Sequence, residues 1–458
     1  MARIPQGRLF GWKQLDAASD LDRLRLVLEA LPDEEFVSFL EQRRDRGRDD
    51  YPIRPTWNAA IAGIVFQHKD AASLLRELWR NAELREVCGF DPSKGGDAVP
   101  SEDAFGRFLK LVIDYREQLL TIFHRLLDEL AKLLPDLGRK MAGDSKAIPS
   151  FGRPVRDEEK QKQPDRRRDT DADWGKKTYR GTRADGSAWE KVVSWFGYKL
   201  HLVVDSVYEL PLAFHLTKAS VGDSPELLPR VEEIAEQHPA VAQRWEEPGA
   251  EMAADKGYDS AENNAGLYDD HNIKPVIDKR TLWKDGEKTR PIFPQRADSF
   301  VYDEAGRVYC VCPLTGEQRD MFFAGFEHER AALKYRCPAA ACGLECRGRK
   351  DCERQAAVGP FGRVIRIPLE LDRRIFIPIA RPTPKWDKAY DRRTAVERVN
   401  SRIDQVLQFE RHTIRGQAKM QTRITLALIV VLAMALGRIR ANQADLMRSL
   451  TAPVRRVA

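Results

Sequence analysis

The sequence predicts a mixed α/β protein: an α-helical N-terminal region, then a mixed sheet with flanking helices, interrupted by a cysteine-rich insertion. Three observations predict it. Apolar residues keep helical spacing up to about residue 134, short β-rich segments follow, and six of the seven cysteines lie between Cys310 and Cys352. At 458 residues the chain has room for two to four compact units. We expect units at 1–135, 136–277, 278–375 and 376–440, and a C-terminal tail at 441–458.

The N-terminal unit is expected to be helical because apolar residues recur every three or four positions from about Leu21 to Leu134. Ser101, followed by two acidic residues, has the pattern of a helix N-cap.

The order βββαβαβ is predicted for the next unit. Its strands are expected at 140–148, 192–205, 210–217, 249–254 and 273–277, and its helices at 223–236 and 260–270. Residues 153–186, between the first two strands, are highly charged and lack apolar periodicity. We therefore expect a mobile loop there, either a solvated linker or an arm that contacts DNA.

Charge and hydropathy place the protein in the cytoplasm. Lys and Arg (76) nearly balance Asp and Glu (70), so the net charge of +6 is only a modest indication of a polyanionic partner. The N-terminus lacks the apolar stretch of a secretory signal. The apolar run from Ile424 to Gly437 is shorter than the roughly 20 residues that span a bilayer, so we expect a buried core helix and no membrane partner.

Three acidic residues are candidates for a metal-dependent site. Asp144 lies among small residues in the first strand, Asp255 ends the fourth strand, and Glu397 lies on a later helix. Cleavage of a phosphodiester commonly needs two divalent cations, and hard ions such as Mg²⁺ take oxygen ligands. Each residue alone fits an ordinary turn or surface role, and only their combination favours a metal site.

The helix that carries Glu397 has a polar face and an apolar stripe. Tyr390, Arg393, Glu397 and Asp404 are spaced to share one face. The stripe beside them would pack on the sheet and consists of Val396, Val399, Ile403 and Val406. Glu397 is therefore expected at the rim of the core, where it could meet carboxylates at strand ends.

The strings AGDS, FGYKLHLVVD, LTKASVGDS, AADKGYDS and YDRRTAVERVNSRI, in this order, resemble the DDE-type transposases of bacterial insertion sequences with a tyrosine-arginine-glutamate signature. The resemblance covers roughly residues 50 to 440 and implies a ribonuclease-H-like fold. It also implies that the helical unit at 1–135 serves in DNA binding or dimerisation. It implies two Mg²⁺ or Mn²⁺ ions held by Asp144, Asp255 and Glu397. It also implies cleavage at the element's ends and transfer of the freed 3′-hydroxyl into target DNA.

Supporting residues follow from the same resemblance. Tyr390 and Arg393 match the signature and would lie near the DNA end, with Lys256 as a further candidate contact. Asp404 stands where the family has a lysine, so the DNA contact made by that lysine is in question. Arg402 or Arg411 are candidate substitutes.

The implied partners are double-stranded DNA, as terminal inverted repeats and as target, and further copies of the chain in a homodimer or larger assembly. The implied location is the cytoplasm, in association with the nucleoid. Two other functions stay open. One is a catalytically inactive or domesticated DNA-binding protein, and the other is a ribonuclease-H-like nuclease without strand transfer.

Other residues have competing interpretations. Asp205 ends the second strand and could bind a metal, but the resemblance places the ligands elsewhere. His201 is expected to pack within the sheet, and Asp259 to cap the following helix.

The insertion is expected to have little apolar core of its own, so a structural Zn²⁺ held by four thiols would fold it. Free or redox-active thiols and an iron–sulfur cluster are the alternatives. The candidate ligands are Cys310, Cys312, Cys337, Cys342, Cys346 and Cys352.

Overall fold

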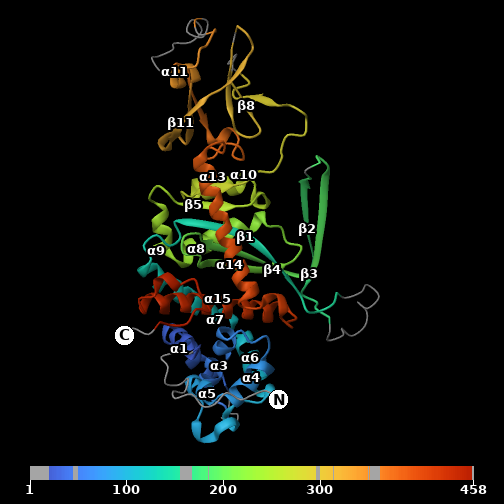
Figure 1. Cartoon of the computed structure of the whole chain (residues 1–458), viewed down its shortest axis with the longest axis vertical. Coiled ribbons are helices and arrows are strands. Elements are labelled where there is room, and N and C mark those ends of the chain that lie inside the picture. The colour runs from blue at the N-terminus through green and yellow to red at the C-terminus, as the bar shows by residue number, and fades with distance from the viewer. Residues whose placement is uncertain are drawn as a thin grey trace, which may run out of the picture.

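A computed structural model describes residues 20–44, 50–154, 168–183, 185–295, 300–312, 314–348, 350 and 362–455. Figure 1 shows a helical part at one end, a sheet in the middle and a second β-rich part at the other end. The N-terminal helices are α1 (Asp20–Ala30), α2 (Glu34–Arg43), α3 (Ile53–Val65), α4 (Ala71–Arg80), α5 (Ala82–Cys88), α6 (Glu102–Asp114) and α7 (Arg116–Leu133), with a 3-10 turn η2 (Pro92–Ala98). The side chain of Ser101 accepts a hydrogen bond from the N–H of Ala104 at 3.3 Å, so α6 begins at its predicted cap.

The central sheet contains β1 (Lys140–Pro149), β2 (Asp173–Thr182), β3 (Ala188–Asp205), β4 (Pro211–Lys218), β5 (Glu251–Ala254) and β6 (Lys274–Ile277). In space the order is β4, β3, β1, β5, β6, and β2 pairs with the first half of β3. Strand β3 runs antiparallel to β1 and β4, whereas β1, β5 and β6 are parallel. This mixed α/β sheet is ribonuclease-H-like, and the predicted fold class is confirmed.

Helices cover both faces of this sheet. They are α8 (Leu227–Gln237), α9 (Pro239–Ala242), α10 (Ala261–Ala265), α13 (Pro384–Tyr390), α14 (Thr394–Gln405) and α15 (Gln417–Arg440). The short turns between them are η4 (Ser224–Glu226), η5 (Gln243–Trp245), η6 (Lys256–Tyr258), η7 (Gly266–Asp270), η10 (Asp391–Arg393), η11 (Phe409–Arg411) and η12 (Ala444–Leu446). Gly143 of β1 faces Leu227 of α8, and Lys146 of β1 pairs with Asp404 of α14. Because residues 143 and 146 point to opposite sides of a strand, α8 and α14 lie on opposite faces.

The apolar helix predicted around residues 424–437 is α15, which packs against α1, α3 and α7. It is long and apolar enough to cross a membrane, but 83% of its most apolar window is buried inside the protein. That burial is the signature of a core helix. In Figure 1 it lies between the sheet and the N-terminal helices.

The prediction of a mobile loop at 153–186 is wrong for its second half. Residues 173–182 form β2, whose ten residues pair in continuous antiparallel register with β3. Residues 155–167, also part of that prediction, lie outside the described residues. The strand was not predicted because its sequence is charged and lacks an alternation of apolar and polar residues. Most of the ribbon that β2 forms with β3 is exposed on both faces, and a strand exposed on both faces does not need that alternation.

The cysteine-rich insertion is β-rich. It contains β7 (Thr289–Pro291), β8 (Phe300–Asp303), β9 (Val308–Val311), β10 (Gln318–Asp320), β11 (Phe322–Glu327), β12 (Ala332–Arg336) and β13 (Val364–Pro368), with α11 (Pro338–Cys342), η8 (His328–Arg330) and η9 (Leu369–Leu371). The expectation that it has little apolar core is wrong. A separate buried cluster fills it, and this cluster includes Ile292, Phe300, Leu333, Ile367 and Phe376.

Candidate active site

The parallel pairing of β1 with β5 sets the position of two carboxylates. The last paired residues are Gly143 and Ala254, and the next residue of each strand is Asp144 and Asp255. Parallel neighbours lie about 4.8 Å apart, so Asp144, in the middle of β1, lies beside Asp255 at the end of β5. The side chain of Asp255 also accepts the N–H of Gly257 at 2.7 Å, which caps η6 and fixes the turn after β5.

The electrostatics of Asp144 show that the two carboxylates interact. Burial raises the pKa of Asp144 to about 6, and the negative charge of Asp255 adds to the increase. The charges of Lys177 and Arg393 oppose it. Two adjacent carboxylates that repel each other are a suitable donor set for a hard divalent cation, which would relieve the repulsion.

Glu397 lies on α14 beside this pair but does not join it. Its carboxylate is held by Arg393 Nη1 at 2.6 Å, and its side chain is half exposed. Arg393 is also influenced by the charge of Asp144 and lies over the ring of Tyr390. Arg393 therefore interacts with Glu397 and also with the charge of Asp144.

Among the described residues, no group of three His, Cys, Asp or Glu side chains is arranged to hold a metal ion. The structure thus brings two of the three predicted carboxylates together and leaves the third in an ion pair. The apolar stripe beside Glu397 is buried as predicted, with Val396, Val399 and Ile403 nearly inaccessible.

Sequence reasoning missed a second set of polar residues around the pair. Lys177 of β2 donates to the backbone carbonyl of Ser145 at 3.2 Å. On the other side, Lys199 Nζ lies 3.0 Å from Asp223 Oδ1. Burial alone would raise the pKa of Asp223, but the Lys199 ammonium, together with the Ser145 hydroxyl and the charge of Lys177, outweighs it, and that pKa is lowered.

Tyr258 is influenced by the charges of both the aspartate pair and Asp223. It is buried, and its pKa is raised well above its usual value by burial and by the charges of Asp144, Asp223 and Asp255. Asp223 belongs to one of the strings that carry the family resemblance, which was the only signal for it. Lys177 gave none, because its segment was interpreted as a loop.

The other candidate DNA contacts have different surroundings. Arg402 binds the carboxylate of Glu209 at 2.8 Å, and Asp404 pairs with Lys146 of β1. Lys256 is exposed beside Asp255. Arg411 lies in η11 after the end of α14. Their proposed contacts with DNA stay predictions.

The competing residues have structural partners. Asp205 is fully buried and accepts the N–H groups of Gly138, Val207 and Tyr208 at 2.6 to 2.8 Å. His201 lies 2.9 Å from the hydroxyl of Thr217 within the sheet. The expectation for Asp259 is wrong, because Ser260 caps α10.

Asp259 instead binds Arg374 at 2.6 Å. The two residues connect the turn after β5 to the segment that leads into α13.

Among the described residues, the cysteines of the insertion form no disulfide, and they are Cys310, Cys312, Cys337, Cys342 and Cys346. Cys352 lies outside the described residues. The Thr315 hydroxyl and the backbone N–H groups of Thr315 and Leu314 lower the pKa of Cys312. Zinc binding stays a prediction.

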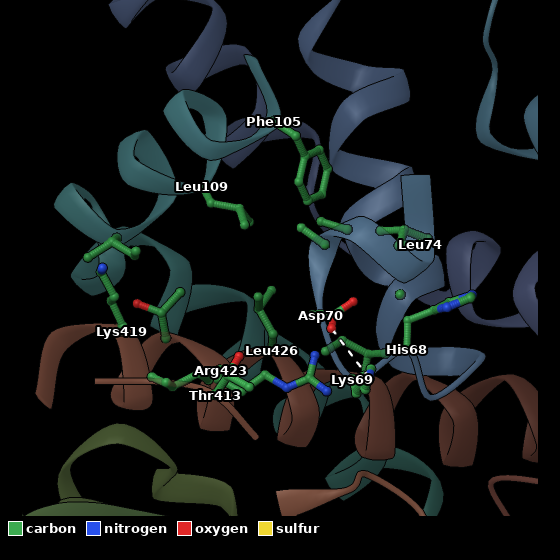
Figure 2. A pocket seen from close by; sticks show the side chains of 17 residues that line it. His68, Lys69, Asp70, Leu74, Phe105, Leu109, Thr413, Lys419, Arg423 and Leu426 are labelled. Atoms are coloured by element: carbon green, nitrogen blue, oxygen red, sulfur yellow. Dashed lines mark ion pairs between the residues drawn. The ribbon is translucent and has the colours of Figure 1, made fainter. Parts of the chain in front are cut away.

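A cavity of about 250 Å³ lies between α15 and the N-terminal helices. Figure 2 shows Phe105, Leu109 and Leu426 on its apolar wall and the Arg423 side chain extending along its floor. Burial lowers the pKa of Arg423 to about 10. The cavity contains none of the predicted site residues.

Comparison with protein families decides the assignment. The family described as "Transposase DDE domain" matches residues 144–433, which is more than half of the chain. The chain belongs to this family of DDE transposases. The match begins at Asp144 and includes Asp255 and Glu397.

Two other comparisons add little to the family assignment. No curated protein matches the chain. A solved structure described as a piggyBac transposase synaptic complex with hairpin DNA is similar at 11% identity and a TM-score of 0.35, over 96% of this chain and 80% of that one.

Proposed function

We propose that this DDE transposase cleaves DNA at the ends of an insertion sequence and joins the freed 3′-hydroxyl to target DNA. The observation that carries the proposal is the register of β1 with β5, which brings Asp144 and Asp255 side by side in a member of this family. DDE transposases generally use divalent metal ions. Two such ions, Mg²⁺ or Mn²⁺, would activate the attacking oxygen and stabilise the leaving oxygen.

The roles of the chain's own residues follow from their positions. Asp144 would hold the ions from the middle of β1, and Asp255 from the end of β5. Glu397 would complete the ligand set from α14 after its half-exposed carboxylate leaves Arg393. Arg393, once released, would present its guanidinium to a phosphate close to the aspartate pair.

The proposed partners are the terminal inverted repeats and the target duplex, bound by a homodimer or larger assembly associated with the nucleoid. The family assignment supports DNA as the partner. The ribbon and the helical N-terminal part offer surfaces beyond the aspartate pair for holding it.

The test is cleavage of DNA that carries the element's native flanking ends. Wild-type protein with Mg²⁺ should release a 3′-hydroxyl end and then form joined products, and EDTA should abolish both. Asp255→Asn keeps the side-chain oxygen that accepts Gly257 N–H but loses the charge, so cleavage should fall by about 10³-fold or more. Glu262→Gln, an exposed carboxylate on the nearby α10, is the matched control and should retain activity.

The outcomes separate the alternatives. Cleavage that persists in Asp255→Asn would refute the site assignment. Cleavage without joined products would identify a nuclease without strand transfer. Binding without cleavage at any Mg²⁺ or Mn²⁺ concentration would identify an inactive DNA-binding protein.

A further inference from the structure

The ribbon formed by β2 and the first half of β3 has an unusual exposure. Both faces of residues 187–194 are accessible, and Val192 and Val193, whose side chains point to opposite faces, are 47% and 38% exposed. Figure 1 shows the ribbon extending beyond the sheet without a helix layered on it. Isolated two-stranded ribbons are only marginally stable in water. Other contacts must therefore stabilise the part of the β2–β3 ribbon that extends beyond the sheet.

Two tryptophans stabilise the ribbon from one side. In the register, Trp195 faces Gly175 and Trp189 faces Gly181. A Cβ atom added to either glycine would lie about 2.5 Å from the opposite indole, so each indole lies directly over the backbone of β2. This cross-strand packing covers the β2 backbone on one side of the ribbon.

The side chains on that side form what we call the lysine–tryptophan face. Because alternate residues of a strand share a face, it includes Asp173, Gly175, Lys177, Gly181, Trp189, Lys191, Val193 and Trp195. Two of these are lysines, and the acid, Asp173, accepts hydrogen bonds from the N–H and the hydroxyl of Ser220 at the end of the ribbon nearest the sheet. The opposite face includes Trp174, Lys176, Thr178, Glu190 and Val192, so there an acid lies on the exposed part of the ribbon.

The lysine–tryptophan face begins at the aspartate pair. Lys177 reaches the backbone of Ser145 and is one of the charges that act on Asp144. Lys191 lies farther along the same face, toward the exposed part of the ribbon. A polyanion bound at Asp144 and Asp255 would therefore continue along a surface of complementary charge.

The dimensions suit duplex DNA. The ten residues of β2 extend over about 33 Å at 3.3 Å per residue, which is close to one turn of B-DNA. The major groove, about 12 Å wide, admits a two-stranded ribbon. We propose that the β2–β3 ribbon docks its lysine–tryptophan face against the DNA duplex that flanks the phosphate at the active site.

This inference rests on the proposed function, but its test does not require cleavage. Full-length protein is titrated, in EDTA, with a fluorescein-labelled mixed-sequence duplex of roughly four helical turns, over a range of salt concentrations. Lys191→Glu should weaken binding about 5-fold or more and reduce the slope of log K against log salt by about 1. Lys176→Glu makes the same charge change on an exposed residue of the opposite face and should stay within about twofold of wild type.

Equal affinities of Lys191→Glu and Lys176→Glu would overturn the inference and leave the proposed function intact. Absence of duplex binding by the wild-type protein would overturn both. Thermal melting of the two variants checks that the ribbon substitutions leave the fold unchanged.

A cross-linking experiment tests which face of the ribbon contacts the DNA. Benzoylphenylalanine at position 193 should cross-link to the duplex on irradiation, whereas the same group at position 192 should not. Because β2 is an edge strand, the ribbon could instead pair with a second copy of the chain. Protein–protein cross-links from position 193, without cross-links to DNA, would overturn the proposal in favour of self-association.

Discussion

Lys146 of β1 and Asp404 of α14 form an ion pair that joins the strand of Asp144 to the helix of Glu397. The two side chains are only 12% and 18% exposed. Asp404 stands where the resembling family has a lysine, and here the lysine comes from the strand instead. The pair therefore helps to fix the position of α14 on the sheet.

A double-mutant cycle tests this coupling. Lys146→Met and Asp404→Asn should each lower the free energy of unfolding by about 1–3 kcal/mol, because each leaves a poorly solvated charge without its partner. The double variant should lose less than the sum, with a coupling energy of about 1–2 kcal/mol from urea unfolding. Additive losses would show that the pair does not position the helix.

Metal binding should appear as stabilisation. Saturating wild-type protein with Mn²⁺ at about 100 times its dissociation constant should stabilise it by about 2.7 kcal/mol, measured as an increase in melting temperature. Asp255→Asn should show little increase. In EDTA the same variant should be at least as stable as wild type, because it removes the charge that opposes ionisation of Asp144. A full Mn²⁺ response in Asp255→Asn would contradict the assignment of this ligand.

The buried part of the fold was predictable from the sequence, because burial imposes a pattern. Strands β1, β3, β4, β5 and β6 pack against helices. Their apolar residues predicted the order of these strands along the chain, and the strands on which Asp144 and Asp255 lie. The β2–β3 ribbon lacks covering layers, so its sequence resembled a charged loop. The core of the insertion was missed because its apolar residues are distributed over several strands of three to six residues.

The site was predictable only in part. Helical spacing placed Glu397 at the edge of the buried stripe, but spacing does not determine a side-chain rotamer, and Arg393 decides where that carboxylate points. The pairing of Lys199 with Asp223 depends on the path of the chain after β4. Such contacts between distant segments leave no local pattern in the sequence.

Glu209 should be a strong determinant of stability. It is 5% exposed and lies within 3.4 Å of three arginines, Arg398, Arg402 and Arg448. Glu209→Ala should lower the free energy of unfolding by about 2–4 kcal/mol, since it leaves these cations without a shared counterion. Glu370→Ala, which removes an exposed carboxylate 3.9 Å from Arg373, should cost less than about 0.5 kcal/mol. Similar losses in urea unfolding would contradict the structure.

The pH dependence of stability should include a contribution from His124. Its Nδ1 lies 3.0 Å from His238 Nε2, and His238 Nδ1 lies 2.7 Å from Asp128. Burial, with the charge of His238, lowers the pKa of His124 from 6.5 to about 4. Between these values the unfolded chain binds a proton that the folded protein does not, so acidification below pH 6.5 favours unfolding.

Wild-type protein should therefore lose up to about 2 kcal/mol of stability from this residue between pH 6.5 and 5. His124→Gln retains a hydrogen-bonding group toward His238 but does not titrate in this range, and its stability should fall less steeply. Urea unfolding of both proteins at pH 8, 6.5 and 5 measures the difference, with pH 8 as the reference at which His124 is neutral in both states. If the two stability curves run parallel from pH 8 to 5, His124 is not held neutral by burial, and the acid sensitivity of the fold has another origin.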